Sequence, residues 1–425
     1  MTDITQTPDL SRPIGRGRLD AIVTELRRQE AKRNDFVVDS GDLRIVPVAN
    51  GDSKVPVPYL VPRASAWDFL PQAGVPLKRQ ALVQIAEKAM TGGVPTKFLD
   101  RAWTEHPEMI ADFLTGVMQE NRKRRLVRVL EDRDGVDRCR AFLGQNFKAI
   151  DNLDIAVNAL ERAQEFGAFP VEASLSDSHF RLRLVSAEIG EVLNRTDTST
   201  GGHRFYEPGQ LASVASGAGD AWRNNGAAQG RDESGLDTIH PIVALRNSET
   251  GHGGCDGDIG ELLRVCFNMC MTERLVHQVH VGEKLQEGVF TRATYEKHAA
   301  LVYSQIGDVV SAGFDPAKFA KRIDAVRGAQ EHLVRAPTVA ANVLISSNSG
   351  LRDLDLDALV STFVAQPGRP TIYNLGQAAA RLAQDRTPDD AESLEWLAGR
   401  VCSGKLTAEI ETATFTHERK LELAR

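Results

Sequence analysis

The chain has 425 residues, of which 42% are hydrophobic and 26% charged, and its formal net charge is -7. These fractions are typical of a globular protein with one sizeable core and two or three folding units, and they exclude wholesale disorder. The negative total excludes a histone-like polycation, so any contact with nucleic acid has to use local basic patches.

No targeting or membrane segment is visible. The start MTDITQTPDLSRPIGRGRLDAI lacks the apolar region of a signal peptide, and no later run reaches the roughly 18 apolar residues that a membrane span requires. We therefore expect a cytoplasmic protein without a membrane partner. The 5 cysteines are odd in number and lack a compact framework, which favours reduced thiols over disulfides.

Residues 1–75 are expected to form a flexible arm, a helix over 19–33 and a hairpin. Apolar residues recur through the helix at the spacing of an amphipathic face. The segment DFVVDSGDLRIVPV predicts a hairpin that turns at Ser40-Gly41. The next segment, VPVPYLVPRASAWDFLP, is expected to be an extended connector, because each proline lacks a backbone donor and disfavours helix at the residue before it.

An α+β core is predicted for residues 76–290, with antiparallel β-hairpins packed on helices. Three helices come first, over 78–90, 96–105 and 107–119. The segment RRLVRVLEDRDGVDRCRAFL then predicts a hairpin around Asp134-Gly135, a dipeptide that tolerates the positive φ of a tight turn. A further helix is expected to begin at Asp151 or Asn152, since either side chain can cap free amides.

The core is expected to continue in a β-β-β-α order. VEASLSDSHFRLRLVSAE predicts a hairpin that turns at Ser176–Ser178, TIHPIVALRN predicts a third strand over 239–247, and a long helix is expected over 259–285. The glycine-rich segment 194–238 is longer than most connections inside a domain, and we interpret it as a mobile functional loop. A helical C-terminal subdomain is predicted for 291–425.

Three segments suggest a family. They are RCRAFLGQNFKAIDNLDIAVNAL (138–160), ALRNSETGHGGC (244–255) and LLRVCFNMCM (262–271). In order and spacing they resemble the phage- and plasmid-borne family catalogued as domain of unknown function 932, with its R-A-F-L-S and I-D-N segments, its asparagine-serine-glutamate-x-glycine turn and its R-x-V-C-x-N helix. Where relatives have asparagine followed by glycine, this chain has Asn268-Met269. The resemblance implies a phage, prophage or plasmid context and no settled activity.

The predicted strands carry arginines at alternate positions. Arg138 with Arg140, and Arg181 with Arg183, are two residues apart, so each pair should project from one face of its strand. With Arg246 they are candidate phosphate-binding residues, because guanidinium groups bind phosphate oxygens bidentately. The β-β-β-α order resembles the core of single-strand annealing proteins of the Red-beta, RecT and Erf types, which is an analogy of fold only. The alternative is that these arginines solvate a sheet face or pair with nearby acids.

The densest basic run is NRKRRLVR, with Arg122, Lys123, Arg124, Arg125 and Arg128. This run is either a phosphate site or a solvated junction between a helix and a strand. In the glycine-rich loop, aromatic residues stand beside arginines, and Trp222 is a candidate for stacking on bases. The alternative is a loop that anchors itself with its aromatic side chains.

Metal binding and catalysis have weaker signals. Zinc-type ligands occur at His252, Cys255, Cys266 and Cys270, and two further histidines at His277 and His280. The spacing lacks Cys-x-x-Cys pairs, so buried apolar thiols are the better interpretation, and we expect no metal or other cofactor. In the NSETG segment, Ser248 and Glu249 supply a hydroxyl and a carboxylate, but the sequence fixes no histidine base beside them.

The expected function is ATP-independent binding, including annealing, of single-stranded DNA by a homo-oligomer. One alternative is a protein-interaction factor that modulates a host defence or replication complex, which suits the acidic total. The other is a metal-dependent hydrolase or nuclease that uses Glu249. Neither GxxxxGK[ST] nor a strand-linked GxGxxG occurs, so nucleotide hydrolysis and dinucleotide chemistry are unsupported.

Overall fold

A computed structural model describes most of the chain. Trp222, His252, Cys266 and His280 lie outside the described residues, as does most of the 194–238 loop. No helix in the described part is long and apolar enough to cross a membrane. The described residues are 16–51, 53–63, 70–89, 95–145, 147, 150–186, 188–193, 237–251, 253–263, 268–278, 292–347, 356–366, 369–384, 386 and 388–423.

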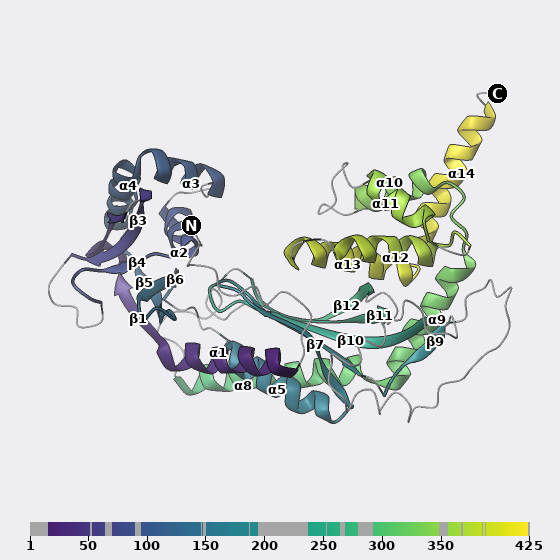
Figure 1. The fold of residues 1–425 in the computed structure, drawn as a ribbon, viewed down its shortest axis with the longest axis horizontal. Coiled ribbons are helices and arrows are strands. Elements are labelled where there is room, and N and C mark those ends of the chain that lie inside the picture. The colour runs from purple at the N-terminus through teal and green to yellow at the C-terminus, as the bar shows by residue number, and fades with distance from the viewer. Residues whose placement is uncertain are drawn as a thin grey trace.

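Two three-stranded antiparallel sheets and three helices form an N-terminal lobe, on the left of Figure 1. The sheets have the orders β1-β5-β6 and β2-β3-β4. One hydrophobic core joins Phe36 and Leu60 to Leu114 and Phe142, so the predicted domain boundary near residue 75 runs through this core. The chain enters the lobe from α1 (Arg16–Lys32), whose Ile22 and Leu26 pack in the core of the central sheet. The elements of the lobe are β1 (Arg33–Asp39), η1 (Ser40–Asp42), β2 (Leu43–Asn50), β3 (Ser53–Pro62), β4 (Val75–Pro76), α2 (Arg79–Ala89), α3 (Thr96–Glu105), α4 (Pro107–Glu120), β5 (Arg124–Glu131) and β6 (Asp137–Gly144).

The predicted hairpin at Ser40-Gly41 is wrong, because β1 pairs with β5 while β2 pairs with β3. The short η1 turn directs the chain from one sheet to the other. The first part of the expected proline-rich connector, residues 55–62, is instead part of the strand β3. Its prolines lack donors but use their carbonyls: Pro58 accepts from the Leu77 amide at 2.7 Å, and Pro56 accepts from the Trp103 indole at 2.9 Å.

The central sheet is an antiparallel meander with the order β12-β11-β10-β8-β7. The short strand β9 also pairs with β10. The hairpins predicted at Asp134-Gly135 and Ser176–Ser178 are confirmed as β5-β6 and β7-β8. The elements of this part are α5 (Asn152–Gln164), β7 (Ala168–Leu175), β8 (Phe180–Ser186), β9 (Glu191–Leu193), β10 (Asp237–Asn247), β11 (Cys255–Leu263) and β12 (Asn268–Gln278).

The long helix predicted over 259–285 is wrong, because β11 and β12 occupy its described positions. Every residue of β11 is buried, so neither face of the strand is exposed to solvent. The alternation of polar and apolar residues that marks a half-exposed strand is therefore missing from its sequence. At Gly260 an added Cβ would lie 2.1 Å from the Cys270 carbonyl oxygen, a closeness of strands that a glycine permits. The β-β-β-α order is therefore replaced by a longer meander, while the α+β class is confirmed.

Helices cover both faces of the central sheet (Figure 1). One face packs on α5 and α8 through a core that includes Leu182, Val243 and Ile306. The other face carries α13, whose Trp396 packs beside Met271 of β12. The predicted helical C-terminal subdomain is confirmed in the described residues. It contains α8 (Arg292–Gly313), α9 (Pro316–Glu331), α10 (Pro337–Ser347), α11 (Leu356–Val364), α12 (Ile372–Ala383), α13 (Pro388–Cys402) and α14 (Thr407–Leu423).

Candidate nucleic-acid interface

The basic run lies at a corner of the N-terminal lobe, between the end of α4 and the start of β5. Backbone bonds hold it to η1: Ser40 N donates to Lys123 O at 2.9 Å, and Lys123 N donates to Ser40 Oγ at 3.0 Å. The Arg122 guanidinium lies across the turn and bonds Asp39 at 3.1 Å and Asp42 at 2.6 Å. This position requires Gly41, because a Cβ there would lie 2.4 Å from Arg122 Nε.

Lys123 and Arg124 are exposed and make no ion pair within the described part of the chain. The sequence interpretation missed Arg63, which reaches the same corner through a bond from its amide to Asp42 O at 2.8 Å, and the exposed Arg44 follows two residues after Asp42. We call these cations, together with Arg122, the basic corner. The segments that form it carry three carboxylates, Asp39, Asp42 and Glu120, so cations are in modest excess.

Arg125 differs from its neighbours in the run. Its guanidinium lies over the Phe142 ring, 6.0 Å from the centroid, and burial lowers its pKa. The partly buried guanidinium is stabilised by the aromatic face rather than by a carboxylate. Arg125 therefore supports the β5-β6 sheet, and the exposed cations of the run are Arg122, Lys123 and Arg124.

Arg138 and Arg140 do not form the predicted pair on one surface. Arg138 bonds Asp132 at 2.9 Å and Asp134 at 2.5 Å, and its hydrogen bond lowers the pKa of Asp134 to about 2. A β-bulge leaves Arg140 out of the regular ladder, and this side chain is buried, with Gln29 at 3.3 Å and Glu249 at 4.0 Å. One arginine closes its own hairpin turn, and the other lies in the interior.

Arg181, Arg183 and Arg246 share one face of the central sheet, as predicted for the first two. Arg246 lies opposite Arg181 in the β8-β10 ladder, and the neighbouring Leu182 points to the other face. The structure buries this arginine face: Arg181 and Arg183 are each 9% exposed. A phosphate would have to displace the groups that cover it.

Carboxylates from the sheet and from α13 cover the arginines. Arg183 bonds Glu172 at 3.0 Å and Glu395 at 2.6 Å, while Arg246 bonds Asp256 at 2.6 Å and Glu392 at 2.8 Å. We call this arrangement the sheet-face ion network. Its ion-paired members are Glu172, Arg183, Arg246, Asp256, Asp258, Arg274, Glu392 and Glu395, and Arg181 lies on the same face opposite Arg246.

The sequence interpretation missed Arg274 and all five carboxylates of this network. Arg274 bonds Asp258 at 2.8 Å and Glu392 at 3.3 Å, and it lies 5.3 Å from the Trp396 ring centroid. A signal for two of the acids was present, because Asp256 and Asp258 alternate as residues on one face of a strand do. Four arginines face five carboxylates, so the network has no positive excess with which to attract phosphate.

Burial in this network raises the pKa of Glu395 to about 7 from the usual 4.5, although Arg183 opposes the shift. At pH values between these two pKa values, Glu395 keeps its proton in the folded chain and has released it in the unfolded chain. The free energy of unfolding therefore falls as pH rises through this range. We expect the free energy of unfolding of the wild type to fall relative to Glu395→Gln between pH 5 and pH 8, by on the order of 2 kcal/mol.

Urea unfolding at the two pH values measures this difference, because other titrating groups are common to both proteins. A Glu409→Gln variant, which changes an exposed glutamate on α14, is the control and should follow the wild type. Parallel stability curves for wild type and Glu395→Gln would contradict the raised pKa.

The NSETG turn connects the N-terminal lobe to the central sheet. The Glu249 carboxylate accepts from the Asn152 amide at 2.8 Å, so it caps α5 in place of Asp151, which makes no side-chain cap bond. The Glu249 carbonyl accepts from Arg128, and the Thr250 carbonyl accepts from Gln84 at 2.6 Å. These contacts give the turn a structural role, in which one carboxylate oxygen of Glu249 caps a helix and the other lies 4.0 Å from Arg140.

The buried thiols predicted at Cys255 and Cys270 are confirmed, and Cys139 and Cys402 are likewise free and buried. Within the described residues no group of three or more metal-binding side chains occurs. Cys255 pairs with Gln278 at one end of the β11-β12 ladder while Cys270 pairs with Glu261 toward the other, so the two sulfurs do not share a site. His277 instead donates from its ring Nδ1 to the Asp256 carboxylate.

Comparison with known proteins leaves the chain without an assigned family. No family model matches it, no curated protein is similar to it, and no solved structure resembles it. The resemblance to the family of domain of unknown function 932 stays a prediction from three sequence segments.

Proposed function

We propose that this chain binds single-stranded nucleic acid through the basic corner, without ATP and in a phage, prophage or plasmid context. The exposed Lys123 and Arg124 carry the proposal, because they make no ion pair within the described residues and their backbone is fixed. Lys123 bonds Ser40 of η1, and Arg124 pairs with Asp39 of β1. Exposed cations on a fixed backbone attract phosphates and release counterions on binding. The sheet-face arginines, expected from sequence to have the same role, are left out of this proposal because Arg183 and Arg246 bond carboxylates and Arg181 is buried beside them.

The first test is fluorescence polarisation of labelled single- and double-stranded oligonucleotides across a salt series. We expect single strands to bind, and a Lys123→Glu/Arg124→Glu variant to lose at least about tenfold in affinity at low salt. The slope of log K against log salt should flatten by about 1.4, because two phosphate contacts to a single strand are lost.

The matched control is Lys318→Glu/Lys321→Glu, which makes the same charge change at exposed positions of α9. It should retain binding within about twofold, since screened charges far from the site contribute little. An equal loss in both variants would show that net charge alone governs binding, and no binding by the wild type would remove the proposal.

The homo-oligomer expected from sequence remains part of this proposal, but the edges of the central sheet are poor places for it. The β7 edge carries Pro170 and a bulge, and the β12 edge carries two register shifts. Prolines and bulges are features that protect sheet edges from pairing with another chain. We therefore expect an oligomer of this chain to form through another surface and not by pairing of strands at these two edges.

A protein-interaction role is the second candidate, favoured by exposed apolar side chains on neighbouring helices of the N-terminal lobe. Phe98 on α3 is 61% exposed, and Met109 and Phe113 on α4 are 59% and 46% exposed. Large exposed apolar groups are common at protein interfaces. A stoichiometric complex with one host protein that is lost on Met109→Ser/Phe113→Ser, with no binding of oligonucleotide, would favour this role.

A further inference from the structure

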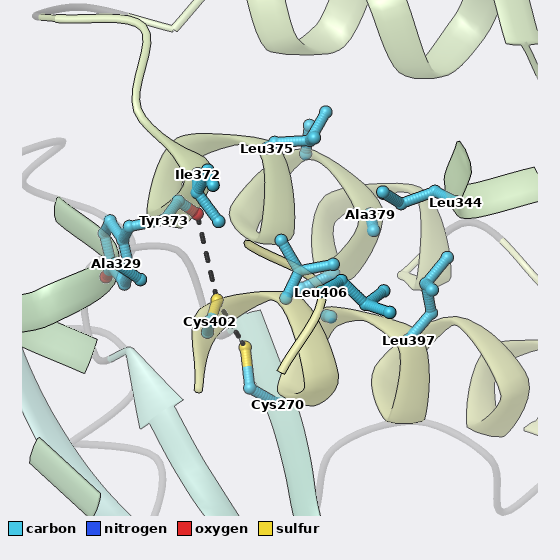
Figure 2. Close-up of a cluster of buried hydrophobic side chains, with 14 of the residues drawn as sticks. Cys270, Ala329, Leu344, Ile372, Tyr373, Leu375, Ala379, Leu397, Cys402 and Leu406 are labelled. Carbon is cyan, nitrogen blue, oxygen red and sulfur yellow. Dashed lines mark hydrogen bonds between the residues drawn. The ribbon is translucent and has the colours of Figure 1, made fainter. Parts of the chain in front are cut away.

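Two buried cysteines from distant parts of the chain meet between the central sheet and the C-terminal helices. Cys270 is on β12 and Cys402 is the last residue of α13, and their sulfurs are 3.8 Å apart although 132 positions separate them in sequence. Figure 2 shows both side chains in the core that α12 and α13 share. They are 3% and 1% exposed.

The side-chain amide of Gln377 is hydrogen-bonded to both sulfurs. The Gln377 amide donates from Nε2 to Cys270 Sγ at 3.6 Å and to Cys402 Sγ at 3.7 Å. Its orientation is set by Asn268, whose Nδ2 donates to Gln377 Oε1 at 2.8 Å. The Gln377 amide therefore contacts both sulfurs and holds them side by side.

We propose that Cys270 and Cys402 are an oxidisable pair, which hydrogen peroxide converts into a disulfide between them. One sulfur, as thiolate, attacks a peroxide oxygen, and the O–O bond breaks to give a sulfenic acid and, after proton uptake, water. The second thiol then attacks the sulfenic sulfur, the S–S bond forms, and the S–O bond breaks to release a second water. Two thiols are oxidised and one peroxide is reduced to two waters.

The product joins β12 covalently to the end of α13. These elements are already in contact, since Lys405 Nζ donates to Thr272 O at 3.1 Å just beyond the helix. The disulfide would therefore close a long loop without a change of fold, and long closed loops restrict the unfolded chain most. Oxidation is expected to raise the melting temperature of the full chain by at least about 3 °C, and a reductant should reverse the change.

The test uses the full-length protein treated with hydrogen peroxide, blocked with N-ethylmaleimide under denaturing conditions and digested without reductant. Mass spectrometry should show a Cys270–Cys402 linked peptide pair that is two hydrogens lighter than the separate peptides. A Cys139→Ser control should keep this link, and Cys402→Ser should lose it.

The proposal is overturned if both thiols of the wild type are recovered as maleimide adducts at peroxide doses that already oxidise methionines. Linkage of either cysteine to another partner would also overturn it. Because the peptide map of the wild type decides the outcome, the result does not depend on whether the Cys402→Ser variant folds. Nucleic-acid binding plays no part in this readout.

Discussion

A Gly399→Ala variant is expected to lose at least about 3 kcal/mol in free energy of unfolding. Gly399 faces β12, and a Cβ at this position would lie 1.9 Å from the Met271 carbonyl oxygen. That oxygen belongs to the backbone of a paired strand, so the helix would have to move away from the sheet as a body. The loss is measured by urea unfolding followed by circular dichroism.

The matched control is Gly328→Ala in α9, where a Cβ would meet no heavy atom within 4 Å. There the same change should stabilise by about 0.5 to 1 kcal/mol, because alanine favours helix over glycine. Opposite signs at the two glycines would show that backbone contact decides the effect. A neutral Gly399→Ala would contradict the close packing of α13 on β12.

An Arg183→Met variant should cost about 3 to 5 kcal/mol at neutral pH, because it leaves carboxylates buried without their cation. Glu395 is 6% exposed and Glu172 is 15% exposed, and both bond Arg183. The loss should be smaller at pH 5, because burial raises the pKa of Glu395 to about 7 and the acid can protonate. Urea unfolding at the two pH values measures the difference.

An exposed pair is the control for this result. Arg101 and Glu105 form an ion pair with side chains 78% and 48% exposed, and Arg101→Met should cost about 0.5 kcal/mol or less. A double variant, Arg183→Met/Glu395→Leu, should recover part of the loss, since the buried charge is removed with its partner. If Arg183→Met were as stable as the wild type but failed to bind oligonucleotide, the sheet-face arginines would have the phosphate role that we assign to the basic corner.

Features with a local signal were predicted well. The helix predicted over 96–105 has these bounds in the structure, and the hairpin at Asp134-Gly135 turns with a φ of 77° at the glycine. The arginines of β8 lie on the face opposite Leu182, as alternation requires. The same local signal failed for β11, where full burial removes the alternation between exposed and buried faces.

The site could be predicted only in part. The run from Arg122 to Arg124 was found because its residues are consecutive, but Arg63 was missed because its place at the corner depends on a backbone bond to Asp42. Likewise, nothing local indicates that Glu395 pairs with Arg183, since 212 positions separate them.

By itself the sequence determined the α+β class, two hairpins, the five helices that precede β7 and the position of the basic run, because each depends on side-chain period or turn chemistry within a short segment. Only the tertiary structure decided which cations are neutralised. The arginines of the central sheet meet Glu392 and Glu395 of α13 there, whereas Lys123 and Arg124 stay exposed. The physical reason is that the interaction energy of a charge depends on the distance to other charges and on its burial. Both are set by parts of the chain that are distant in sequence and that folding brings together.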